Sequence, residues 1–188
     1  MKNESKDKYD LVTAFPPYLQ KDVHETLGIL RESHLGYSDC EEFRVSGDIL
    51  SIPYRIYYDE PDQTQLSLLT CELQVILHSL YTRHQNGYVR EGHVTTLIGY
   101  ANDYIWITPY LMLPIGEYVK EILEVIYDNR SSLNSDFIRA FFRENPRLYR
   151  TIQSRVASYW DCYYREKYPE KRYYVGLQLL DFLTSFLN

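Results

Sequence analysis

The spacing of apolar residues predicts a chain built mainly from amphipathic helices. In most of the sequence, apolar positions recur every three or four residues, which places them on one face of a helix. The clearest case lies within residues 60–84, where Asp62 and Thr64 are candidate caps for the helix start. Asn86-Gly87 interrupts the pattern at its end. The apolar stripe consists of Leu66, Leu69, Leu73, Ile76, Leu77 and Leu80.

Turn and capping residues divide the chain into about seven helices. We expect a first helix within residues 16–36 that ends before Gly36, and another at residues 88–100. Pro114 separates a short helix from a longer one over Ile115 to Tyr127. Asn134 or Ser135 caps the next helix, Pro146 starts the following one, and a last helix comes after Pro169.

The helical period is lost between residues 43 and 58. Short alternating segments flank Ser46-Gly47-Asp48, a sequence that favours a hairpin turn, and Pro53 confines the second segment to an edge or a bend. The predicted fold class is therefore all-α, with helical-repeat-like packing and one small β-hairpin near residues 43–58. Residues 1–10 are predicted to be a disordered lead, and residues 11–188 a single domain.

Composition, charge and the absence of known motifs argue against several classes of function. The chain of 188 residues has a formal net charge of −6, which argues against binding of a nucleic-acid backbone. Its polar start and its short apolar runs predict a cytoplasmic protein that does not enter the membrane. Its three cysteines show no metal-ligand spacing and are expected to be reduced and mostly buried. We expect no metal and no cofactor, and no nucleotide loop or nucleophile elbow is present.

Two arginines and two histidines gather around the Asn86-Gly87 break. Arg83 and His84 fall at a helix end, and Arg90 and His93 share a face of the next helix. Such a corner can hold a phosphate or a carboxylate. Cations at a helix C-terminus also have a purely structural explanation, which we favour. A metal site that uses His78, His84 and His93 is not expected, because no carboxylate or cysteine completes the pattern.

The 20 tyrosines are several times the number expected for a chain of this length. Tyrosine is enriched at protein interfaces, although it also fills half-buried core edges. One group lies on the predicted edge strand, which could pair with a partner chain or could equally be covered by the protein's own helices. A second group surrounds a helix that is either central to the fold or docks a partner. The interaction candidates are Tyr54, Arg55, Tyr57, Tyr58, Tyr159, Trp160, Tyr163 and Tyr164.

An acidic ridge is predicted on the helix that follows Pro114. Glu117, Glu121 and Glu124 have i, i+4, i+7 spacing, which places their side chains on one helix face. Lys120 lies between them. We interpret this ridge as a solvated charged surface and not as a metal site.

The middle of the chain resembles HEAT or armadillo-type helical repeats over about residues 64–145. The segment "NGYVREGHVTTLIG" is similar to the start of a HEAT unit, and Pro109 and Pro114 are similar to the prolines that kink such helices. The resemblance implies a stack of helix pairs that binds other macromolecules, and it carries over no catalytic residue.

The function predicted from these patterns is therefore a non-catalytic protein–protein interaction domain with an unknown protein partner, or a homodimer. The alternative is an enzyme or ligand-binding protein that holds a phosphorylated or carboxylated small molecule at Arg83, His84, Arg90 and His93.

Overall fold

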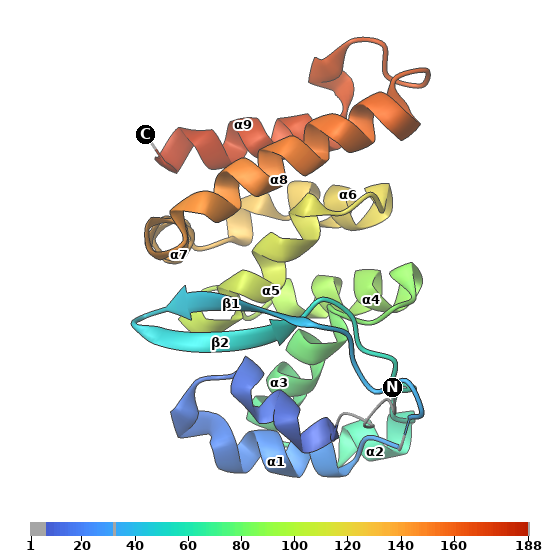
Figure 1. The fold of residues 1–188 in the computed structure, drawn as a ribbon, viewed down its shortest axis with the longest axis vertical. Helices are drawn as coiled ribbons and strands as arrows, with labels where there is room; N and C mark the ends of the chain where they lie inside the picture. Colours follow the sequence, from blue (N-terminus) through green and yellow to red (C-terminus); the bar gives the residue numbers. More distant parts are fainter. Residues whose placement is uncertain (1–6, 32, 188) are drawn as a thin grey trace, which may run out of the picture.

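The computed structural model describes residues 7–31 and 33–187, and it confirms a mainly α-helical fold with one small β-hairpin. The described chain contains nine α-helices, seven of them with nine or more residues, where about seven helices were predicted. Helices stack along the longest axis in approximate chain order, from α1 at one end to α9 at the other, and the hairpin covers one side of the middle (Figure 1). The likeness to HEAT repeats stays a prediction.

The first third of the chain forms one end of this stack together with the hairpin. Its elements are the 3-10 helices η1 (Lys8–Ala14) and η2 (Pro17–Leu19), α1 (Gln20–Gly28), β1 (Cys40–Val45) and β2 (Asp48–Pro53). The two strands pair in antiparallel register. Ser46 and Gly47 both have positive φ angles, 54° and 87°, as a two-residue type I′ turn requires. The hairpin prediction is confirmed, although the strands end at Pro53.

The middle and last thirds contribute the remaining helices. In order these are α2 (Gln63–Ser67), α3 (Cys71–Tyr81), α4 (Gly87–Ile98), η3 (Ile105–Ile107), α5 (Thr108–Met112), η4 (Leu113–Gly116), α6 (Lys120–Asp128), η5 (Arg130–Ser132), α7 (Ser135–Glu144), α8 (Pro146–Tyr159), the π-helical turn η6 (Trp160–Tyr164), η7 (Lys171–Tyr173) and α9 (Val175–Leu187).

Side-chain caps mark the starts of four α-helices in the described chain, α2, α3, α4 and α7. Asn86 Oδ1 accepts the Tyr88 N–H at the start of α4, and Asn134 Oδ1 accepts two N–H groups at the start of α7. Asp62 and Gln65 form a reciprocal capping box on α2. Asp62 and Asn134 were among the caps expected from the sequence. Asn86 belongs to the predicted helix break at Asn86-Gly87.

Three predicted helices are wrong in extent. The first helix ends at Gly28, well before Gly36. The helix predicted within residues 60–84 is two helices, because Thr70 accepts the Leu73 N–H and caps a new start. The helix expected from Ile115 begins only at Lys120, since Leu113–Gly116 forms a 3-10 turn.

The predicted disordered lead falls partly outside the described residues, which begin at residue 7. Lys8, Tyr9 and Asp10 belong to the 3-10 helix η1, and the Lys8 ammonium donates to the Leu30 carbonyl at 2.7 Å.

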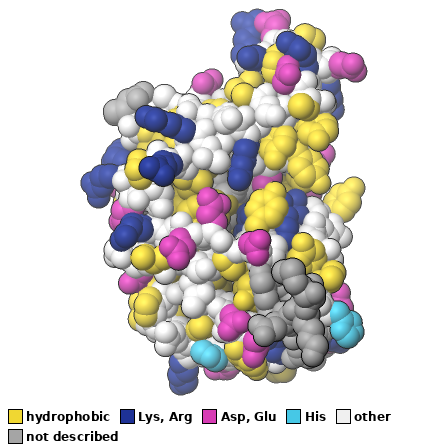
Figure 2. All heavy atoms as spheres, in the orientation of Figure 1, with side chains coloured by type: hydrophobic (Ala, Val, Ile, Leu, Met, Phe, Trp, Pro, Cys, Tyr) yellow, Lys and Arg dark blue, Asp and Glu magenta, His cyan; other side chains and the backbone are white. Residues whose placement is uncertain are grey.

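A single hydrophobic core runs through the stack. It includes aromatic contacts between distant segments, such as the Phe15 ring stacked on Tyr110. On the face drawn in Figure 2, hydrophobic side chains gather at the level of α6 and α8, with Lys or Arg side chains beside them. Among the described residues, no helix is both long and apolar enough to cross a bilayer.

Candidate functional site

Glu117 is the carboxylate at the centre of the most concentrated charge in the fold. It directly follows η4, which ends at Gly116. Its backbone is extended, and α6 begins three residues later at Lys120. Its side chain is only 3% exposed. The predicted acidic ridge is therefore wrong for this residue, because Glu117 precedes the helix that carries Glu121 and Glu124 and points into the protein.

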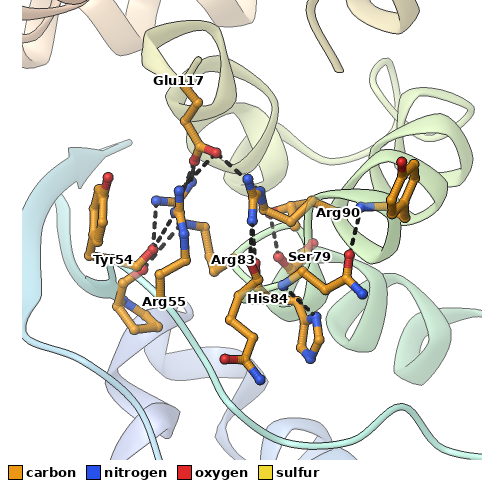
Figure 3. Close-up of polar contacts among 12 residues, drawn as sticks. Tyr54, Arg55, Ser79, Arg83, His84, Arg90 and Glu117 are labelled. Atoms are coloured by element: carbon orange, nitrogen blue, oxygen red, sulfur yellow. Dashed lines mark hydrogen bonds and ion pairs between the residues drawn. The ribbon is translucent and has the colours of Figure 1, made fainter. Parts of the chain in front are cut away.

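Three guanidinium groups from separate segments surround this carboxylate (Figure 3). Arg55 meets both of its oxygens, with Nη1 3.0 Å from Oε1 and Nη2 2.9 Å from Oε2. Arg83 Nη1 donates to Oε1 at 2.9 Å. Arg90 Nε lies 3.1 Å from Oε2 as an ion pair without hydrogen-bond alignment. We call these four residues the arginine–glutamate cluster.

The other arginine donors bind backbone carbonyls. Arg83 donates to Pro53 O and Tyr54 O, at 3.2 and 2.9 Å. Arg90 Nη1 donates to His84 O and Gln85 O, at 2.7 and 2.9 Å. Burial lowers the pKa of Arg83 and of Arg90, and the neighbouring Glu117 carboxylate opposes this shift. The guanidiniums remain charged, because their pKa values start far above neutrality.

Backbone pairing brings the two arginine-bearing segments together. The segment after β2 lies against the α3–α4 connection, where Ile56 N donates to Arg83 O and Gln85 N donates to Ile56 O. Residues 54–57 also hydrogen-bond with the chain before β1, through Tyr54 N to Asp39 O and Tyr57 N to Gly36 O. The predicted edge strand is therefore wrong at these positions. Their backbone groups are used inside the protein and offer no free edge for strand addition.

The cluster has more positive than negative charge. Three arginines face one carboxylate, and a fourth arginine, Arg155 on α8, lies beside them. A small gap of about 10 Å³ is lined by Arg155 and by a second carboxylate, Glu41, together with Tyr54, Arg83 and Glu117. Such a gap has room for one water molecule at most. Arg155 is half-buried and has no ion pair or hydrogen bond with the described residues.

The predicted Arg/His corner divides into two sites. Arg83 and Arg90 reach Glu117, whereas His84 Nδ1 accepts the Asn86 N–H at 3.1 Å. His93 points toward other partners, with Nε2 2.9 Å from Glu60 Oε1 and Nδ1 2.8 Å from His78 Nδ1. The four residues therefore do not converge on one empty space, and the two arginines already hold a carboxylate of the protein itself.

Four tyrosines from three segments form one surface group beside the cluster, which we call the tyrosine patch. It consists of Tyr54 after β2, Tyr118 before α6, Tyr159 at the end of α8 and Tyr163 in η6. The rings of Tyr118, Tyr159 and Tyr163 lie 6.1–6.2 Å apart, centroid to centroid. Tyr54, Tyr118 and Tyr163 are 48%, 54% and 67% exposed. The Arg55 guanidinium lies 4.3 Å from the Tyr54 ring centroid, joining the patch to the cluster.

The other predicted interaction residues are buried or half-buried, and Tyr164 among them has a hydrogen bond to the patch. Tyr58 and Trp160 are buried, and Trp160 Nε1 donates to Tyr168 O. Tyr57 is half-buried. Tyr164 is also half-buried, and its hydroxyl donates to Tyr118 O at 2.6 Å, which fixes the backbone that carries Tyr118. The sequence did not indicate roles for Tyr118 and Arg155, and it placed Glu117 on a solvated ridge. The only local sequence feature that could have indicated that Glu117 precedes the helix was the Pro114–Gly116 turn before it.

The cysteines and the metal-binding groups add no further site. Cys40, Cys71 and Cys162 are all exposed, so the expectation of mostly buried thiols is wrong. Within residues 7–31 and 33–187, no group of three or more His, Cys, Asp or Glu side chains has the arrangement needed to hold a metal ion.

Replacing Glu117 with glutamine should destabilise the fold severely. Glu117→Gln leaves three buried guanidiniums without a counter-charge, and losing one partner of a buried ionic group costs about 3–5 kcal/mol. Urea unfolding followed by circular dichroism measures the loss. Glu121→Gln, an exposed carboxylate on α6, is the matched control and should change stability by less than about 0.5 kcal/mol. Equal stability of the two variants would contradict a structural role for the cluster.

Stability should also fall as the pH drops from about 6.5 to about 4. Burial and the adjacent His93 lower the pKa of His78 from 6.5 to about 4, while Glu60 acts in the opposite direction. Within this window the unfolded chain binds more protons than the folded one, so acid favours unfolding. His78→Gln should make the slope of unfolding free energy against pH shallower, and His24→Gln on the exposed face of α1 should not. An unchanged slope in the His78 variant would refute this account.

Comparison of the chain with protein-family models, with characterised proteins and with solved structures found no match.

Proposed function

We propose that this chain is a non-catalytic protein–protein interaction domain of HEAT-like helical character that binds an acidic segment of another protein through the tyrosine patch. The observation that carries the proposal is the convergence of Tyr54, Tyr118 and the Tyr159–Tyr163 pair from three segments into one surface, in which Tyr54, Tyr118 and Tyr163 are exposed and Tyr159 is half-buried. Tyrosine supplies a large contact area with few rotatable bonds, so an exposed group of them suits an interface.

The patch is held in place before any partner arrives. Tyr164 fixes the Tyr118 backbone, and Tyr118, Tyr159 and Tyr163 support one another through ring contacts. The Arg55 guanidinium stacks against Tyr54 while its nitrogens bind Glu117. Such preorganisation lowers the entropy lost on binding.

Charge selects the kind of partner. The arginine–glutamate cluster contains three arginines and one carboxylate, and Glu41 and the unpaired Arg155 line the gap beside it, so positive charge remains in excess. A partner that brings aspartate or glutamate side chains to this surface gains electrostatic complementarity. A second copy of this chain is less suitable, because a two-fold interface would bring the same positive surfaces together.

The alternative of a small anionic ligand at the Arg/His corner has less support. The gap beside the cluster is about 10 Å³, too small for an organic phosphate or carboxylate. Arg83 and Arg90 are already engaged with Glu117 and with backbone carbonyls. The exposed thiols favour the reducing cytoplasm as the place of the proposed interaction.

Selection of peptides displayed on phage tests this proposal. Peptides enriched on the wild-type chain should contain more aspartate and glutamate than the starting library. Tyr159→Ala and Tyr163→Ala should each weaken binding of the enriched peptides by about tenfold, or ~1.4 kcal/mol. Tyr173→Ala is the matched control, because Tyr173 is 56% exposed but lies outside the patch.

Charge reversal separates the acidic-partner proposal from generic stickiness. Arg155→Glu should abolish the enrichment of acidic peptides while leaving the fold intact, since Arg155 has no ionic partner to lose. The proposal fails if the selected peptides show no acidic bias, or if they bind the tyrosine variants as tightly as the wild type. Concentration-dependent dimerisation in sedimentation experiments that Tyr163→Ala abolishes would instead assign the patch to self-association.

A further inference from the structure

A second polar site lies between α3 and α4 and does not depend on the proposed function. His78 on α3, His93 on α4 and Glu60, which precedes α2, form a hydrogen-bonded chain. Glu60 Oε1 lies 2.9 Å from His93 Nε2, and His93 Nδ1 lies 2.8 Å from His78 Nδ1. His93 is buried, His78 is partly buried, and the Glu60 side chain is 47% exposed.

The direction of these hydrogen bonds follows from the chemistry of the groups. An ionised carboxylate only accepts, so His93 Nε2 donates to Glu60. Burial lowers the pKa of both His78 and His93, which keeps both rings neutral near pH 7. A neutral ring has one N–H, so His93 Nδ1 carries a lone pair and accepts the N–H of His78 Nδ1. His78 Nε2 is then a lone-pair acceptor, and it has no hydrogen-bond partner among the described residues.

The hydrogen-bonded series Glu60–His93–His78 borders an open cavity of about 360 Å³. The cavity is within the size range of small-molecule sites. Thr96 contributes a third acceptor, because its hydroxyl hydrogen is donated to Gly92 O and its lone pairs remain available. Leu66 and Val89 supply apolar walls, and the Tyr88 ring, 84% exposed, stands beside them.

We propose that this cavity binds a small organic ammonium ion that carries a compact apolar group. The Glu60 carboxylate supplies the opposite charge, while His78 Nε2 and the Thr96 hydroxyl accept N–H donors. The Tyr88 ring attracts a cation through its π face. The apolar group of the ligand packs on Leu66 and Val89. An anion is excluded, because the cavity offers it no cationic side chain and Glu60 repels it.

A metal ion does not suit the same groups. Both ring nitrogens of His93 are engaged by Glu60 and His78, and no group of three His, Cys, Asp or Glu side chains among the described residues is arranged to hold a metal ion. An ammonium ion needs only acceptors placed around it, without the fixed coordination geometry that a metal requires.

Titration with three isosteric probes tests the proposal by amide NMR of the full chain. Benzylammonium, benzyl alcohol and benzoate share one ring and differ in charge. Benzylammonium should shift the amide signals of Gly92, His93 and Thr96 in a saturable manner below about 10 mM, a range typical of weak small-ligand binding. Benzyl alcohol should bind at least about tenfold more weakly, and benzoate should not bind.

Variants assign the binding to the cavity. Glu60→Gln keeps the side-chain size and removes the charge, so benzylammonium should bind at least about tenfold more weakly. Glu25→Gln on the exposed face of α1 is the matched control and should bind like the wild type. His78→Phe removes the Nε2 acceptor and should also weaken binding. Because Glu60 is half exposed, its variant should remain folded, which the same spectra report.

Three results would overturn the proposal. Benzylammonium shifts absent up to about 10 mM would do so. So would equal binding of benzyl alcohol or benzoate, and so would unchanged benzylammonium affinity in the Glu60 variant.

Discussion

The buried carboxylate of Glu117 must be neutralised inside the protein, and this requirement organises the middle of the fold. A carboxylate that is 3% exposed is tolerated only with cationic partners and hydrogen bonds close by. Arg55, Arg83 and Arg90 meet that requirement from the segment after β2, from the end of α3 and from α4. One side chain thereby joins the hairpin, the α3–α4 connection and the start of α6.

The same arrangement links stability to the surface. The three arginines carry more positive charge than Glu117 can neutralise. One of them, Arg55, also lies against the exposed Tyr54 ring. Tyr118 immediately follows Glu117 in sequence, so the residue that centres the buried cluster also positions a ring of the tyrosine patch. Burial raises the pKa of Tyr159, with a smaller contribution from Tyr54, which disfavours ionisation of this ring. A neutral aromatic surface above a positive cluster is a suitable interface for an acidic partner.

Sequence patterns predicted the features that depend on local chemistry. The caps at Asp62 and Asn134, the break at Asn86-Gly87 and the Ser46-Gly47 turn all act within a few residues, and all are present. The split at Thr70 was missed because the leucine stripe continues across it. Glu117 was assigned to a helix because its spacing to Glu121 fits one, whereas the Pro114–Gly116 turn delays that helix to Lys120.

Features that depend on tertiary contacts could not be predicted from local sequence patterns. The sequence placed Arg83 and Arg90 in one corner but gave no indication of their partner, which lies 34 residues after Arg83 along the chain. The two tyrosine segments were predicted as separate surfaces, because nothing local shows that Tyr54 and Tyr159 meet beside Tyr118. The histidines were grouped with the arginines by proximity in sequence, although His93 pairs with His78 and Glu60.

A double-mutant cycle between Glu117 and Arg90 tests the central claim most directly. Unfolding free energies of Glu117→Gln, Arg90→Met and the double variant give the coupling between the two side chains. If the buried carboxylate holds the arginines as described, the double variant should lose less unfolding free energy than the two single variants lose in sum. The difference should be about 2–3 kcal/mol, the upper range for residues in one ionic network. Additivity within about 0.5 kcal/mol would show that the two groups do not depend on each other, and would contradict the account.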